Sequence, residues 1–216
     1  MVFTIDLYWS MRSPFCYLAL DRLLALDREP DVRINIKHVW PGAMRREGYF
    51  DKLDPNYTRY HHRDTARLGE YLGLPYGRPK PDPLMFDRAT MAPLPLSEQP
   101  HIGRLTALAV LAVEAGAGMA FLDPATRLIW SGTVTDWHLG DHLARAAAGA
   151  GLDFDDLAAR ADAEADRLYA AVTANGDDLR AAGHWGVPCM VLDDEPFFGQ
   201  DRLELLTWRL NQARQA

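Results

Sequence analysis

Several features that would mark particular classes of protein are scarce in this sequence. Only two cysteines occur in 216 residues, too few for a scaffold held together by disulfides, so we expect reduced thiols and a cytoplasmic protein. No apolar run approaches the roughly 18 residues of a membrane-spanning helix, and the first residues lack the basic and apolar regions of a signal peptide. Positive charge is not in excess either: the net charge of −7 argues against nucleic acid or a membrane as a general partner.

What is present is the composition of an ordinary globular protein, with 48% hydrophobic and 25% charged residues. The first forty residues predict a strand, a helix and a second strand. Val2–Trp9 and Asp31–Trp40 alternate between apolar and polar residues, as half-buried strands do. Between them Ser13 is a good N-cap residue, and Pro14 occupies the first helical position. Two parallel strands joined by a helix form a right-handed crossover unit.

From about residue 41 to residue 182 the pattern becomes helical. Glycine, proline and aspartate interrupt it and suggest the boundaries of the helices. We expect helices at Tyr57–Leu72, His101–Ala115, Asp136–Ala150, Phe154–Arg160 and Ala161–Ala174, with a proline-rich loop at Leu74–Pro100.

The end of the chain returns to a β pattern. Cys189–Leu192 is a short apolar strand, Asp193-Asp194 a hairpin turn, and Pro196–Phe198 the partner strand. Asp201 resembles the start of a capping box for a final helix that runs to about Ala213. The sequence therefore predicts an α/β, thioredoxin-like fold (βαβ…ββα) formed by residues 1–40 and 183–216, with an all-helical subdomain inserted at residues 41–182.

The first candidate for chemistry is the turn Ser13-Pro14-Phe15-Cys16. It stands where a thiol–disulfide enzyme carries Cys-x-x-Cys, and the helix N-terminus there favours a negative charge. Serine replaces the outer cysteine, so an internal dithiol cannot form at this turn. The alternative is that Ser13 is only an N-cap.

The second candidate site is formed by two segments near the C-terminus. In a thioredoxin-like fold Pro188 of Gly186-Val187-Pro188 adopts a cis peptide bond, and Val187 then presents its backbone opposite the first helix. The alternative is an ordinary turn proline. Farther along, Gln200 and Asp201 could hold a ligand's ammonium or carboxylate, or Asp201 could simply cap the last helix.

Other residues suggest substrate contacts more weakly. Arg12, beside the turn, could attract an anionic substrate or stabilise a thiolate. Trp40 is expected either in the core or in the wall of an aromatic-substrate pocket between the two subdomains. His138 and His142 lie one helical turn apart, but no third ligand is evident, so we predict no metal site. His61 and His62 are expected on a solvated helix face.

Taken together, the motifs resemble those of a known family. The strings SPFCYLAL, after a strand, and GVPCMVLDDEPFFGQDRLELL, at the far end, resemble the DsbA-like thioredoxin superfamily. More narrowly they are similar to 2-hydroxychromene-2-carboxylate isomerases and kappa-class glutathione transferases. The spacing Tyr60-x3-Asp64-x2-Arg67 before Gly73-Leu74-Pro75 is a further likeness.

This resemblance implies a use for both candidate sites. Ser13 would activate the thiol of bound, reduced glutathione. Val187, beside cis-Pro188, would pair with the tripeptide backbone, and Gln200 and Asp201 would hold its γ-glutamyl end. The resemblance also implies a homodimer.

One further residue matches the family, and two positions differ from it. Asn56, after Pro55, matches an asparagine near the sulfur. The family usually carries an Asp-Phe pair where this chain has the segment 9–12, and a threonine where it has Cys189. These departures concern the substrate and co-substrate more than the fold.

The sequence supports three hypotheses about function. The first is a glutathione-dependent isomerase of the 2-hydroxychromene-2-carboxylate type acting on a small aromatic keto-acid, with a kappa-class glutathione transferase as an alternative. The second is a DsbA-like thiol–disulfide oxidoreductase that uses Cys16 or Cys189. The third is a binding protein without catalysis.

Overall fold

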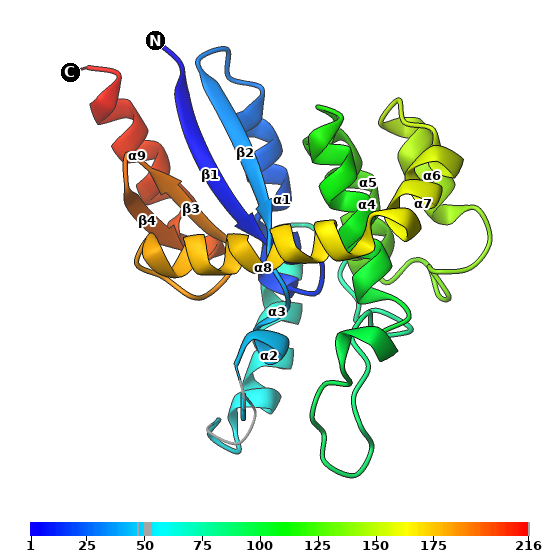
Figure 1. Ribbon diagram of the computed structural model, residues 1–216. Helices are drawn as coiled ribbons and strands as arrows, with labels where there is room; N and C mark the ends of the chain where they lie inside the picture. Colours follow the sequence, from blue (N-terminus) through cyan, green and yellow to red (C-terminus); the bar gives the residue numbers. More distant parts are fainter. Residues whose placement is uncertain (47, 50–52, 216) are drawn as a thin grey trace.

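The centre of the molecule is a four-stranded mixed sheet in the order β2-β1-β3-β4, seen in Figure 1. The computed structural model describes residues 1–46, 48–49 and 53–215. The strands are β1 (Phe3–Trp9), β2 (Val32–His38), β3 (Cys189–Leu192) and β4 (Glu195–Phe198). β1 and β2 are parallel, whereas β3 is antiparallel to both β1 and β4. The two ends of the chain therefore meet in one sheet.

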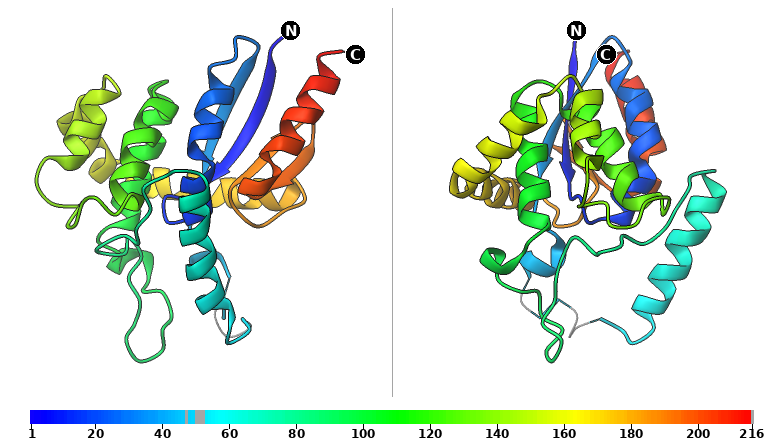
Figure 2. Two further views of the ribbon diagram at one scale, coloured as in Figure 1. Left: turned by 180° about the vertical axis from the view of Figure 1, so that it is seen from behind. Right: turned by 90° about the vertical axis from the view of Figure 1, so that its right-hand side faces the viewer.

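Helices cover both faces of this sheet. α1 (Pro14–Asp27) and α9 (Leu203–Ala213) lie side by side on one face, and α8 (Ala165–Ala181) crosses the other, as Figures 1 and 2 show from opposite sides. Successive strand residues point to opposite faces. Leu7 of β1 accordingly belongs to the main core, while its neighbour Tyr8 packs in a second cluster that includes Leu179 of α8.

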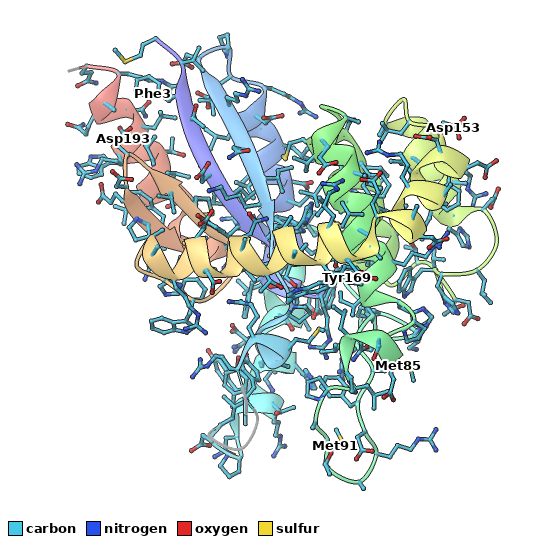
Figure 3. All side chains as sticks on the ribbon, in the orientation of Figure 1. Phe3, Met85, Met91, Asp153, Tyr169 and Asp193 are labelled. Carbon is cyan, nitrogen blue, oxygen red and sulfur yellow. The ribbon has the colours of Figure 1, made fainter. Side chains whose placement is uncertain are left out.

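Between β2 and β3 the chain is helical. α4 is the most buried of these helices and packs against α5 and α7, whereas α3 buries only Thr65 and Gly69. In Figure 3 the loop carrying Met91 projects away from the sheet on the same side as α3. The elements are α2 (Gly42–Arg45), α3 (Tyr57–Tyr71), η1 (Leu96–Glu98), α4 (Ile102–Glu114), α5 (Gly118–Trp130), α6 (His142–Gly149), α7 (Phe154–Ala163) and, after β4, η2 (Gln200–Arg202).

The predicted fold class is confirmed, and so are several local details. The order βαβ, helices, ββα is present. Ser13 caps α1, with Pro14 in its first turn. Asp193 and Asp194 form the β3–β4 turn with φ values of 49° and 64°, the conformation that a tight hairpin turn requires. The boundaries proposed for the inserted subdomain stay a prediction, since α8 also packs on β2.

Four expectations about helices were wrong or incomplete. Residues 136–141 are not helical, because Asp136 and Gly140 adopt φ values of 55° and 62°. The break before α8 falls at Glu164, beyond the expected position. α5 was missed, since Pro124 lies inside it and proline argues against a helix interior. The final helix begins at Leu203 without a side-chain cap.

No helix in the described ranges has both the length and the apolar character needed to cross a membrane.

Candidate functional site

The turn between β1 and α1 presents one hydroxyl at a helix N-terminus. The turn is closed by a backbone hydrogen bond in which the Ser13 N–H donates to the Ser10 carbonyl at 3.0 Å. The Ser13 hydroxyl oxygen accepts the Cys16 N–H at 3.3 Å, which satisfies one of the amides that a helix start leaves open. The side chain is half-buried, so its hydroxyl is held in place at the positive end of the α1 dipole.

The loop before β3 faces this turn. The Val187–Pro188 peptide bond is cis, as expected. The Val187 carbonyl lies 3.5 Å from the Ser13 hydroxyl oxygen, within reach of its proton. The Pro188 carbonyl accepts the Gly199 N–H at 2.9 Å, which ties the loop to the end of β4. Ser13 and Val187 are thus brought together from positions 174 residues apart.

Both cysteines are buried and free. Cys16 and Cys189 each have 0% exposure, and burial raises the pKa of each thiol to about 12. They pack in separate clusters, Cys16 in the main core and Cys189 with Tyr8 and Leu179 under α8. Both side chains are therefore neutral thiols at neutral pH.

Gln200 and Asp201 lie in η2, beside α1. Gln200 is 9% exposed, and its side-chain carbonyl accepts a hydrogen bond from Arg22 of α1. Asp201 is exposed and pairs with the neighbouring Arg202 at 2.7 Å. Asp201 therefore does not cap α9, and its carboxylate faces solvent rather than a helix amide.

Two side chains of the turn reach the helical part of the chain. Arg12 makes a bidentate ion pair with Asp82, with N–O distances of 2.6 and 2.7 Å, and its guanidinium lies 5.1 Å from the centre of the Phe86 ring. Phe15 and His61 of α3 pack in a T-shaped arrangement with ring centroids 5.2 Å apart. Side chains of α3 and of the loop after it therefore contact the turn.

The expectation of a solvated face was wrong for His61. Its ring also stacks on Tyr57, with centroids 5.6 Å apart. Burial lowers the pKa of His61, and the nearby positive charges of Arg78 and Arg12 lower it further. The imidazole is therefore a neutral aromatic surface at neutral pH.

Trp40 and Asn56 lie apart from these contacts. The Trp40 indole is 5% exposed, donates to Thr173 at 3.1 Å and packs against Tyr169, which Figure 3 labels on α8. Its assignment to a substrate pocket stays a prediction that this burial does not favour. Asn56 is exposed at the start of α3 and lines a surface hollow of about 340 Å³ with Arg59, Tyr60 and Arg63.

Sequence reasoning missed Asp82, Phe86 and the contact between Phe15 and His61. No local pattern marks Asp82, which lies in a proline-rich loop 70 residues from its partner. His138 and His142 do not share a helical face as the sequence suggested. His138 lies against His101, with ring centroids 4.5 Å apart, while the His142 ring hydrogen-bonds with Arg145. Within the described residues, no three potential metal ligands gather.

The chain belongs to the family of DsbA-like thioredoxin domains, whose family model matches residues 4–211. Comparison with curated proteins gave no match. Among solved structures, a 2-hydroxychromene-2-carboxylate isomerase superposes with a TM-score of 0.72 and 20% identity, covering 98% of this chain and 96% of that one.

Two further neighbours are thiol–disulfide enzymes by name. A probable DsbA oxidoreductase from Streptomyces coelicolor has a TM-score of 0.65 at 20% identity, with 99% and 90% coverage of this chain and that chain. The cytosolic disulfide reductase DsbM from Pseudomonas aeruginosa, solved with GSH, has a TM-score of 0.59 at 17% identity, with 96% and 99% coverage. At these identities the likeness shows the shared fold.

Proposed function

We propose that this protein is a glutathione-dependent isomerase of the 2-hydroxychromene-2-carboxylate type, acting on a small aromatic keto-acid. One observation carries the proposal: the family's thiol position is occupied by the Ser13 hydroxyl, which lies opposite the Val187 backbone at the N-terminus of α1. A site that offers a hydroxyl but no exposed thiol is suited to holding the sulfur of another molecule.

The residues fit glutathione in three respects. The Ser13–Val187 hydrogen bond is long, at 3.5 Å, so the hydroxyl proton can turn toward an incoming sulfur. Val187 precedes a cis proline and offers strand-like backbone to an extended peptide. Asp201 is an exposed carboxylate near the start of α9, and its solvent-exposed pair with Arg202 leaves the second carboxylate oxygen for an ammonium group. These contacts would leave Ser13, Val187, Pro188 and Asp201 around the tripeptide, and Gln200, whose carbonyl accepts from Arg22, would reach it through its amide N–H group.

When bound, glutathione supplies a thiolate that can add to a conjugated carbon and leave again, which permits rotation about the former double bond. Ser13 would donate a hydrogen bond to the sulfur, and the α1 dipole would stabilise the negative charge. Arg12 lies beside the turn with its charge balanced by Asp82, and its remaining N–H groups would contact the carboxylate of an acidic substrate. Phe15, His61 and Phe86 offer aromatic surface for a substrate ring.

The buried cysteines bear on the alternative of a DsbA-like oxidoreductase. Thiol–disulfide exchange begins with an accessible thiolate. Cys16 has 0% exposure and a pKa of about 12, which disfavours it as the attacking group. A kappa-class glutathione transferase would use the same Ser13 site and differ only in the second substrate, so it stays the nearer alternative.

We further propose a homodimer in the cytoplasm, where reduced glutathione is abundant and both cysteines would stay reduced. The family likeness supports the dimer, and the cytosolic neighbour solved with GSH supports the compartment and the co-substrate.

The direct experiment is calorimetry with reduced glutathione, followed by a spectrophotometric isomerisation assay on 2-hydroxychromene-2-carboxylate with and without glutathione. We expect binding and glutathione-dependent turnover. No binding at millimolar glutathione would end the mechanism. Binding with conjugation of an electrophile but no isomerisation would favour the transferase.

A further inference from the structure

Arg45, the last residue of α2, joins two distant parts of the backbone. Its Nε donates to the Trp40 carbonyl at 2.7 Å, and its Nη1 donates to the Trp185 carbonyl at 3.0 Å. Trp40 follows β2, whereas Trp185 lies two residues before Val187. One guanidinium thus bridges the segment after β2 and the loop that presents Val187 to Ser13.

Within residues 183–186 the loop is also held by short-range hydrogen bonds and by stacking of His184 on Phe198 of β4, with ring centroids 4.1 Å apart. The His184 N–H donates to the Leu179 carbonyl at 3.1 Å, and the Gly186 N–H donates to His184 Nδ1 at 2.9 Å. The bond from Arg45 spans 140 residues. It is therefore a directed polar contact between the loop and the segment after β2, beside the apolar packing of Val187 on the cluster that contains Val39.

Packing restricts where the Arg45 side chain can go. It lies against α8 at Gly176, where an added Cβ would be 3.5 Å from Arg45 Cδ. Burial lowers the pKa of Arg45, and its charge acts on the Cys16 thiol in the opposite direction to burial. The guanidinium therefore lies close enough to the first turn of α1 for its charge to be felt there.

We infer that Arg45 is a positioning residue, which holds the 185–187 backbone at the distance and angle at which Val187 receives an extended thiol peptide beside Ser13. This inference rests on the proposed use of glutathione. Arg45 does not touch the reacting sulfur, and it acts through Val187. The bridge uses donors on two nitrogens of one rigid plane, Nε and Nη1. The three donors of a lysine ammonium all radiate from a single atom and cannot reach both carbonyls in the same geometry.

The test compares Arg45→Met, Arg45→Gln and Arg45→Lys with Arg46→Met, a matched control at the exposed neighbouring arginine. Removing a charged donor weakens one loop contact, so we expect the Met variant to raise the KM for glutathione about 10-fold while kcat at saturating glutathione changes less than about 2-fold. Lysine should recover part of the loss. The KM for the aromatic acid should stay unchanged, and so should every constant of the Arg46 control.

A second measurement needs no glutathione. Amide hydrogen exchange in the free protein should be about 10-fold faster across residues 183–187 in the Met and Gln variants than in the wild type or the control. If the wild type binds no glutathione but this exchange still depends on Arg45, the proposed function fails and the positioning of the loop stands. If the wild type binds glutathione and the Arg45 variants match it in KM and exchange, or lose kcat alone, the inference fails and the proposed function stands.

Discussion

The two sides of the candidate site are built in different ways. On the sheet side, Ser13 and Val187 are held by backbone geometry: a helix cap, a cis peptide bond and strands with a buried core. On the helical side, contact with the turn is made by side chains, through Arg12–Asp82 and Phe15–His61. α3, which supplies His61, buries only two of its residues.

The two kinds of construction suit two different tasks, recognition of a peptide backbone and selection of a ligand by side chains. Backbone contacts recognise any extended peptide and change little when side chains are replaced. Side-chain contacts from an exposed helix can vary and can adapt to different ligands. Under the proposed function the sheet side would hold the thiol, and the helical side would select the second substrate. The predictions below test that division.

The largest expected effect comes from Ser13→Ala. Under the proposed function the variant would lose the hydrogen bond to the glutathione sulfur, so kcat/KM should fall by roughly 10²–10³-fold, as for removal of a single donor to a developing anion. Cys16→Ala should keep most of the activity, and Ser97→Ala, at an exposed serine of η1, serves as the control. Steady-state kinetics measures all three. The reverse order, with Cys16→Ala inactive and Ser13→Ala active, would identify a thiol–disulfide enzyme.

The second effect concerns stability on the sheet side as a function of pH. His38, at the end of β2, is 2% exposed, and burial lowers its pKa to about 4. The unfolded chain, with a pKa near 6.5, binds more protons between these values. The free energy of unfolding should therefore decrease as the pH falls from about 6.5 to 4, by at most about 3 kcal/mol.

Denaturant unfolding at several pH values checks this dependence. His38→Gln stays neutral throughout, so the difference in unfolding free energy between variant and wild type should shrink or reverse as the pH falls. A constant difference across the whole range would show that His38 does not titrate between the folded and unfolded states as its burial implies.

The third effect concerns how closely the loop before Pro188 packs against β4. A Cβ on Gly186 would lie 2.3 Å from the Phe198 ring, so Gly186→Ala should cost about 1–3 kcal/mol of stability through overpacking. Gly149→Ala is the matched control, since nothing lies within 4 Å of its added Cβ. Combining Gly186→Ala with Phe198→Ala should recover part of the loss. Equal melting temperatures for the Gly186 and Gly149 variants would refute the close approach.

The smallest effect is expected on the helical side. Arg12 and Asp82 form a bidentate pair, with side chains 22% and 34% exposed. Partial exposure weakens the pair, so a double-mutant cycle with Arg12→Met and Asp82→Asn should give a coupling energy of about 1 kcal/mol. The KM for the aromatic acid should rise more than the KM for glutathione. A larger rise for glutathione would contradict the division between the two sides.

The sheet side was largely predictable from sequence because its signals are local. A proline after Ser13 marks a helix start, alternation marks β1 and β2, and Gly186-Val187-Pro188 marks the loop before β3. Each depends on a few adjacent residues. The exposed fraction of Trp40 was not predictable in the same way, because an aromatic residue after a strand can face either a pocket or the core.

The helical side was poorly predictable because its contacts join residues that are distant in sequence. Asp82 lies in an irregular loop, and its pairing with Arg12 depends on how that loop folds back. His61 lies on a mostly polar helix, so its contact with Phe15 follows from the position of α3 rather than from periodicity. α5 contains Pro124, and the burial of the apolar side chains of α5 in the core outweighs the low helix propensity of this proline.

The central claim is that the sheet side stabilises the thiolate of a bound thiol through Ser13. The most direct measurement is the ultraviolet thiolate absorbance of reduced glutathione, titrated into the wild type and into Ser13→Ala at neutral pH. The account predicts a saturable thiolate signal with the wild type and a much weaker one with the variant. No saturable signal at millimolar glutathione, or equal signals from both proteins, would contradict it.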